Sequence, residues 1–328
     1  MRSHMQEISV ASYTHRGRKL HNEDWLGVFE FPENPVRARR LAIVADGMGG
    51  HNAGELASQT AVETIARELS DRVLFLQNPD DISSVVIEAF RIANETIFAK
   101  ASSEPSCRGM GTTASIVLIL ADRAVIANMG DSRIYLVKCE GIEQLSEDHT
   151  ALASAMKTRH MTDEEIKTFP YTHAITRSLG EETAQEVYTR IVDQFLDSSF
   201  IICSDGLTDV LDEREIHKQV TGTSDLQIAV DNLGKRAYQL GSDDNITIVG
   251  LEIGILKRNN YCVSVEKVNP VKKGTNGQKS KKGHPISLVL ILILIVLLFA
   301  ILAAGLIYYL DAHGYFDRGT VHGIGSIM

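Results

Sequence analysis

The 328-residue sequence contains only four cysteines. They are far apart in the sequence and none forms a C-x-x-C motif, which argues against a zinc site or a thioredoxin-type redox site. No arginine follows any of them at the sixth position, so the Cys-x5-Arg loop of cysteine-dependent phosphatases is absent. Residues 1–7 lack an apolar core, so we interpret them as a tag remnant or a disordered start and not as a signal peptide.

Positive charge is scarce in most of the chain. The formal net charge is -9, with 33 Lys and Arg against 42 Asp and Glu. Nine of the basic and only three of the acidic residues follow Leu256, so the preceding part carries a net charge of about -15. A domain this acidic is not expected to bind nucleic acid through its general electrostatic field. Bound metal ions would cancel some of this charge.

Residues 8–255 have the pattern of one mixed domain, with 44% hydrophobic residues in the whole chain. Helical spacing of apolar residues predicts helices over 55–69, 82–101, 212–220 and 225–240. Short β-branched or apolar runs predict strands over 41–45, 114–120, 124–128, 133–137, 200–203 and 246–251. Two helices separate the first strand from a run of strands joined by tight turns. This order favours antiparallel sheets with helices packed outside over an alternating βαβ pattern.

The chain changes character after residue 255. Residues 256–285 mix lysines with Gly, Asn and Ser, as is typical of a flexible basic linker. Residues 286–310 contain no Asp, Glu, Lys or Arg, and 25 helical residues are long enough to cross a bilayer. The lysines precede this predicted transmembrane helix, so we expect the catalytic domain in the cytoplasm, a single pass through the plasma membrane, and residues 311–328 as a short extracytoplasmic tail. A lipid-binding role for the basic stretch is an accessory alternative.

Acidic residues stand beside glycine or asparagine at the edges of apolar runs, far apart in the chain. Asp46 and Asp205 each follow a predicted strand and precede a glycine, which lets a ligand approach the backbone closely. If the fold gathers these carboxylates, divalent metal ions are the simplest way to hold so much negative charge together. Hard oxygen ligands suit Mg²⁺ or Mn²⁺ and predict metal-assisted hydrolysis of a phosphate ester. The six positions are Glu23, Asp24, Asp46, Asp131, Asp205 and Asp244.

Each of these short motifs, taken singly, is an ordinary turn signal. Their joint occurrence over residues 8–251 closely resembles the metal-dependent protein phosphatases, the PPM or type 2C serine/threonine class, in their bacterial form. The matching runs are Asn22-Glu23-Asp24, residues 44–50 (VADGMGG), 109–113 (GMGTT), 128–133 (NMGDSR), 145–149 (LSEDH), 175–180 (ITRSLG), 204–207 (SDGL) and 244–247 (DNIT).

The resemblance implies an α+β fold: a four-layer α-β-β-α sandwich of two antiparallel sheets flanked by helices, here followed by the C-terminal transmembrane helix. It implies two Mn²⁺ or Mg²⁺ ions, or three. Asp46 would bridge two ions, and the Gly47 carbonyl would bind one of them. Asp205 and Asp244 would hold the other, and Asp131 with Asp205 would hold a weaker third. Glu23 and Asp24 would act mainly through metal-bound water, and residues 150–172 correspond to a flap beside the cleft.

The sequence departs from the family at the residue that grips the substrate phosphate. Family members usually have an arginine four residues before the Glu of the Asn-Glu-Asp motif. Lys19 occupies that position here and Arg18 precedes it, so either could bind the phosphate. A histidine that eukaryotic members place after the first Asp-Gly is replaced by Met48.

The implied substrates are phosphorylated proteins, including membrane-associated serine/threonine kinases or their substrates. Two other enzymatic functions remain open: hydrolysis of small phosphomonoesters, and action on one dedicated regulatory phosphoprotein. A non-catalytic pseudophosphatase is disfavoured because every acidic ligand position is present.

Overall fold

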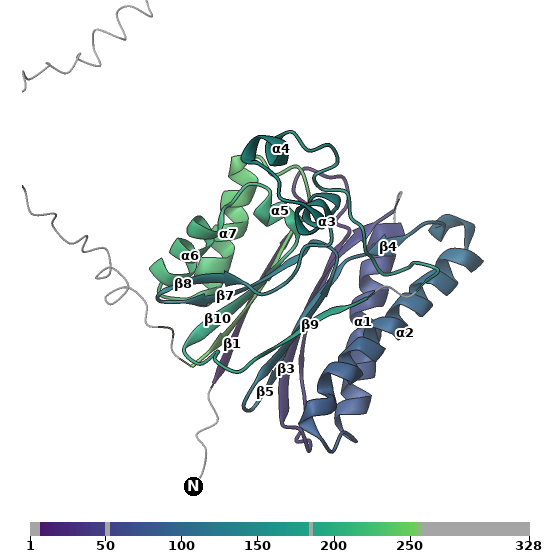
Figure 1. Cartoon of the computed structure of the whole chain (residues 1–328). Coiled ribbons are helices and arrows are strands. Elements are labelled where there is room, and N and C mark those ends of the chain that lie inside the picture. Colours follow the sequence, from purple (N-terminus) through teal and green to yellow (C-terminus); the bar gives the residue numbers. More distant parts are fainter. Residues whose placement is uncertain (1–6, 50–52, 184–185, 255, 257–328) are drawn as a thin grey trace, which may run out of the picture. The chain divides into compact units, whose positions relative to one another are not determined.

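A computed structural model describes residues 7–49, 53–183, 186–254 and 256. Two antiparallel sheets form the centre of this part of the chain (Figure 1). The first has the strand order β1-β11-β10-β7-β8, with β1 (Ile8–His15), β11 (Ile246–Ile253), β10 (Ser198–Cys203), β7 (Arg133–Lys138) and β8 (Gly141–Gln144). The second has the order β2-β3-β5-β6-β9, with β2 (Asp24–Glu30), β3 (Ala38–Met48), β5 (Ala114–Leu120), β6 (Ala124–Met129) and β9 (Tyr188–Val192); β4 (Gly111–Thr112) pairs with β3.

Helices cover the outer face of each sheet. The helices α1 (Ala53–Val73) and α2 (Ile82–Ser103) pack on the second sheet, and α6 (Glu213–Gly222) and α7 (Leu226–Leu240) pack on the first. Figure 1 shows the two helix pairs on opposite sides of the sheets. A third apolar cluster, with Val44, Val117 and Ile202 among its members, fills the space between the sheets. The predicted four-layer sandwich of two antiparallel sheets is therefore confirmed.

Successive side chains of β3 point to opposite faces of the sheet, so this strand packs against two apolar clusters. Leu41 and Ile43 face the helices α1 and α2, whereas Ala42 and Val44 face the other sheet. Successive side chains of a strand point to opposite faces, so a continuous apolar run is what a strand buried on both sides requires. All six predicted strands and all four predicted helices are present, with ends shifted by a few residues.

The antiparallel pairing brings distant acidic residues to one end of the sandwich. Asp24 at the start of β2 is the direct register partner of Asp46 near the end of β3. At the same end of the first sheet, Cys203, which precedes Asp205 by two residues, pairs with Arg133 and with Ile248. The turn that carries Asp131 and the segment that carries Asp244 therefore adjoin Asp205.

The flap, residues 150–172, contains two short helices, α3 (Ala151–Thr158) and α4 (Asp163–Lys167). A bridge between Thr150 and Ile175 closes its base. Two shorter helices, η1 (Pro79–Asp81) and η2 (Pro105–Cys107), flank α2, and α5 (Asp205–Thr208) follows β10.

The predicted linker beyond Leu256, the predicted span 286–310 and the tail 311–328 lie outside the described residues, as do residues 1–6. Within the ranges that the structure describes, every helix is too short or too polar to cross a bilayer.

Candidate active site

Three carboxylates form the centre of the candidate site: Asp24 is buried, and Asp46 and Asp205 are partly exposed. Asp46 lies near the end of β3, Asp24 lies beside it on β2, and Asp205 begins α5. The charges of Asp24 and Asp205 are among the causes that raise the pKa of Asp46. Burial, reinforced by mutual repulsion, raises the pKa of all three carboxyl groups. The sequence predicted that these residues converge, and the fold brings them together.

Asp131 lies at the edge of this group, in the turn between β6 and β7. Its side chain is buried, and burial together with the charge of Asp205 raises its pKa from the usual 3.8 to about 7. Gly130 precedes it with φ +104°, a left-handed conformation that favours glycine. A Cβ at Gly130 would come within 2.5 Å of the Thr113 side chain. The turn is thus held in one conformation that carries Asp131 toward Asp205.

Two carboxylate oxygens in the site lack a hydrogen-bond partner. They are Asp24 Oδ1 and Asp205 Oδ1, and both are buried. Orphaned buried acceptors are rare in folded proteins because each costs free energy. Hard anionic oxygens with no other partner fit Mg²⁺ or Mn²⁺. Among the described residues, no three His, Cys, Asp or Glu side chains are arranged so that they could hold a metal ion as they stand. The fit to a divalent metal rests on the chemistry of the carboxylates and on the two buried oxygens without a partner.

Gly47 and Glu23 are fixed by backbone contacts. The Gly47 amide donates to the Glu23 carbonyl at 3.1 Å, and the Ser58 hydroxyl donates to the same oxygen at 2.6 Å. A Cβ at Gly47 would lie 2.0 Å from the Gly54 carbonyl oxygen, so only glycine fits here. The Glu23 carboxylate packs against Gly54, where a Cβ would come within 2.8 Å of it. The start of α1 therefore lies directly against the Asp46-Gly47 segment.

Asn245 ties the last acidic motif to the first. Its side-chain oxygen accepts from the Glu23 amide at 2.7 Å, and its amide group donates to the carbonyls of Arg16 and His21 at 2.9 Å each. These bonds span more than 220 residues of sequence and hold the loop before β2 beside Asp244. Asn245 is therefore placed to orient the segment that carries Glu23.

Lys19 and Arg18 face different carboxylates. The Lys19 ammonium lies 3.0 Å from Asp244 Oδ1, whereas the Arg18 guanidinium lies 3.3 Å from Asp243 Oδ1, on an exposed pair. Burial lowers the pKa of Lys19, but the hydrogen bond and charge of Asp244, with the charges of Asp46 and Glu23, outweigh it and raise the pKa overall. Of these two basic residues, Lys19 is the one in the field of the carboxylate cluster.

The sequence did not predict the roles of the hydroxyl groups that surround the carboxylates. The Thr113 hydroxyl accepts from the Asp46 amide at 2.9 Å, and the Thr112 hydroxyl donates to the Asp46 carbonyl at 2.8 Å. The Ser204 hydroxyl donates to Asp24 Oδ2 at 2.8 Å. Ser204 borders a predicted ligand in the sequence, but hydroxyls are too common in strands to be assigned from spacing alone.

Asp209 was also missed. Its charge is among the causes that raise the pKa of Asp205 and of Asp131, and His173 approaches its carboxylate at 3.6 Å. Its position four residues after Asp205, one helical turn further along, was the signal that could have identified it.

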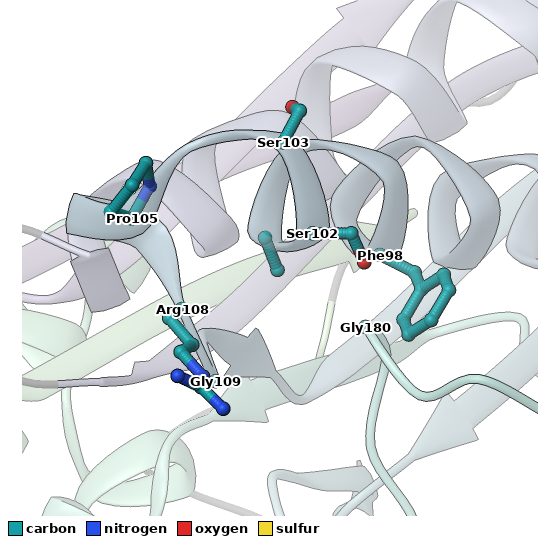
Figure 2. A pocket seen from close by; sticks show the side chains of 8 residues that line it. Phe98, Ser102, Ser103, Pro105, Arg108, Gly109 and Gly180 are labelled. Carbon is teal, nitrogen blue, oxygen red and sulfur yellow. The ribbon is translucent and has the colours of Figure 1, made fainter.

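A cavity of about 550 Å³ lies away from the acidic cluster, at the C-terminal end of α2. Figure 2 shows its lining, which includes Phe98, Pro105 and Arg108. None of the predicted metal ligands lines it. We therefore place the candidate active site at the carboxylates and not in this cavity.

Comparisons with known proteins show which family the chain belongs to. The family model for protein phosphatase 2C matches residues 12–233. Serine/threonine phosphatase stp of Listeria welshimeri is 34% identical over 246 residues, which cover 75% of this chain and 96% of that protein. The crystal structure of the Mycobacterium tuberculosis serine/threonine phosphatase PstP/Ppp superposes with a TM-score of 0.65 at 29% identity, covering 75% of this chain and 99% of that one.

A further solved structure bears on the metal. The catalytic domain of the phosphatase PstP in complex with two manganese ions superposes with a TM-score of 0.62 at 28% identity, covering 75% of this chain and 98% of that chain. Taken with the family model and the relative from Listeria, these matches show that the chain belongs to the protein phosphatase 2C family. It is a protein-serine/threonine phosphatase.

Proposed function

We propose that this enzyme hydrolyses phosphoserine and phosphothreonine in proteins at a centre of two Mn²⁺ or Mg²⁺ ions, or three. The observation that carries the proposal is the group of Asp24, Asp46 and Asp205, whose pKa values are raised and which holds two buried carboxylate oxygens without a partner. Such ions, when bound, lower the pKa of a water molecule and offset charge on the phosphoryl oxygens.

The residues that would hold the ions come from five segments. Asp46, with the Gly47 carbonyl, and Asp205 with Asp244 would hold the two ions. Asp131 with Asp205 would hold a weaker third, and Glu23 and Asp24 would act mainly through water. The Ser204 hydroxyl, which donates to Asp24, and the Thr113 hydroxyl, which accepts from the Asp46 amide, keep these two acids in place.

Hydrolysis of a phosphothreonine peptide by the full chain tests the proposal. We expect turnover with Mn²⁺ or Mg²⁺ and none with chelator, because the carboxylates alone repel a phosphate. Comparison with a small phosphomonoester separates a protein phosphatase from an enzyme for small esters. A chain that binds phosphopeptide but turns over neither substrate is a pseudophosphatase, and activity that persists in EDTA contradicts the metal mechanism.

We infer that Lys19 contacts the substrate phosphate, because its ammonium lies beside Asp244 in the field of Asp46. Lys19→Ala should lower kcat/KM roughly 10- to 100-fold, the value of a charge-assisted hydrogen bond. Lys19→Arg should retain activity, since arginine offers a bidentate fork. Arg18→Ala is the matched control and should remain within about twofold of the wild type, because Arg18 pairs with the exposed Asp243. Greater damage from Arg18→Ala than from Lys19→Ala would reverse the assignment.

We also propose that residues 286–310 anchor the enzyme as a single-pass protein of the plasma membrane, with the catalytic domain in the cytoplasm. The support is the uncharged 25-residue stretch that follows the lysine-rich linker. Tethering raises the local concentration of substrates at the same surface, so membrane-associated kinases and their substrates are the proposed targets. Deleting residues 286–328 should release the enzyme from the membrane fraction and increase phosphorylation of membrane proteins in the cell. An unchanged fractionation and phosphorylation profile would exclude the anchor.

A further inference from the structure

His149 is bonded on one side to the turn that carries Asp131. Its backbone amide donates to the Gly130 carbonyl at 2.9 Å, and its ring Nδ1 accepts from the Gly130 amide at 3.1 Å. The side chain is only 3% exposed. Because φ of Gly130 is +104° and Thr113 leaves no room for a Cβ, only glycine fits at this position of the turn. His149 therefore fixes the residue directly before Asp131.

The other side of the same ring faces groups connected to the flap. Nε2 lies 3.8 Å from Glu147 Oε1 and 3.4 Å from Arg177 Nη1. Glu147 forms an ion pair with Lys157 on α3. The backbone continues the connection, since the His149 carbonyl accepts from the Thr176 amide at 2.8 Å, next to the bridge that closes the base of the flap. One imidazole thus lies between the Asp131 turn and the flap.

The ring is uncharged, which this arrangement requires. Burial, with the nearby charge of Arg177, lowers the pKa of His149 from the usual 6.5 to about 4. A neutral imidazole has one donor and one acceptor nitrogen. Nδ1 accepts from the Gly130 amide, so the proton belongs on Nε2, which faces Glu147 Oε1 at 3.8 Å, beyond hydrogen-bond distance, and Arg177 Nη1 at 3.4 Å. The hydrogen bond from the Gly130 amide to Nδ1 therefore determines which tautomer of His149 the residues near the flap contact.

We propose that His149 is a positioning residue that sets the place of Asp131 through Gly130 and links that place to the flap. The inference rests on the proposed role of Asp131 as a metal ligand. The two ring nitrogens have different roles: Nδ1 accepts the hydrogen bond from the Asp131 turn, and Nε2 lies beside Glu147 and Arg177, which connect to the flap. The His149 ring does not touch the substrate phosphate and is not a catalytic residue.

A matched pair of variants separates the two halves. His149→Asn keeps an acceptor at the place of Nδ1 and loses the group at Nε2, whereas His149→Gln does the reverse. In metal-free, isotope-labelled protein we expect the Gly130 amide to exchange with solvent about tenfold faster in His149→Gln and at the wild-type rate in His149→Asn, because only the former leaves that buried donor unsatisfied. By calorimetry, Mn²⁺ affinity at the weakest site should fall about tenfold in His149→Gln alone.

The two variants should also differ in whether kcat or KM changes. His149→Gln should lower kcat, and His149→Asn should retain kcat and raise KM for a phosphothreonine peptide severalfold, since the flap lies beside the cleft. Should His149→Gln not fold, the ¹⁵N signals of the His149 ring in the wild-type protein decide the matter: a proton on Nε2 and none on Nδ1 from about pH 5 to pH 8 supports the inference, and the reverse overturns it.

Two outcomes distinguish failure of this inference from failure of the proposed metal site. Equal Gly130 exchange and equal Mn²⁺ affinity in His149→Asn and His149→Gln would show that the ring only fills space, and would leave the metal site intact. Wild-type Mn²⁺ binding and activity in Asp131→Asn would instead remove the proposed role of Asp131, and this inference with it.

Discussion

Asp46→Asn should reduce phosphothreonine hydrolysis by more than about 100-fold, because loss of a group that only supports a metal ligand already costs 10- to 100-fold. Asparagine has the same shape but no charge, so it cannot supply the negative charge that the proposed ions require. Asp244→Asn should have a similar effect. Initial rates on a phosphopeptide at saturating Mn²⁺ measure both.

The neighbouring pair Asp243 and Asp244 provides the control. The Asp243 side chain is 88% exposed and pairs with Arg18, whereas Asp244 faces Lys19 and the cluster. Asp243→Asn should therefore keep activity within about twofold, since exposed ion pairs contribute little. Thermal unfolding must show that Asp46→Asn folds. If Asp243→Asn and Asp244→Asn lose activity equally, the proposed metal assignment at this loop is wrong.

Metal-free protein should become less stable as the pH rises from about 4 to about 7, opposite to the usual behaviour of paired carboxylates. Asp131 titrates near 3.8 when unfolded and at about 7 when folded, and burial raises the pKa of Asp24, Asp46 and Asp205 as well. In this window the folded state binds more protons than the unfolded state, so the free energy of unfolding falls with increasing pH.

Adding Mn²⁺ should reverse this trend. At 100 times the dissociation constant, each bound ion contributes about 2.7 kcal/mol, which for two ions raises Tm on the order of 10 °C in a domain of this size. The gain should be larger at pH 8 than at pH 5, because ligands must be deprotonated to bind. Calorimetric scans at both pH values, with and without Mn²⁺, measure it. A metal-free domain that gains stability over the same pH range would contradict the raised pKa values.

The architecture was predictable because its pattern is repeated along the chain. The apolar runs at 41–45 and 114–120 are buried on both faces, and no other regular element buries so short a run so completely. The edge strand β1 was not predicted. Only Ala11 of its eight residues is fully buried, so it lacks the apolar alternation that identifies a strand. Its pairing partner β11 places it in the sheet, and that information lies 240 residues away.

The carboxylates of the candidate site could be predicted from the sequence, but the residues that hold them in position could not. Carboxylates beside glycine at strand ends are a local signal, and Asp46 and Asp205 carry it. The choice between Lys19 and Arg18 depends on which carboxylate each one faces, and spacing cannot provide that. His149 lies in a recognised motif, yet its contact with Gly130 exists only because a hairpin and the following loop fold back on the β6–β7 turn.

The pairing of β1 with β11 joins the beginning of the domain to its end, with Ile8 opposite Ile253. Asp244 and Asn245 immediately precede β11, and Asn245 holds the loop before β2. During synthesis, a chain that has left the ribosome only as far as β10 therefore has neither its last carboxylate nor the amide that orients Glu23. The nascent enzyme should remain inactive until its final strand docks, so fragments released early cannot dephosphorylate proteins in the cell.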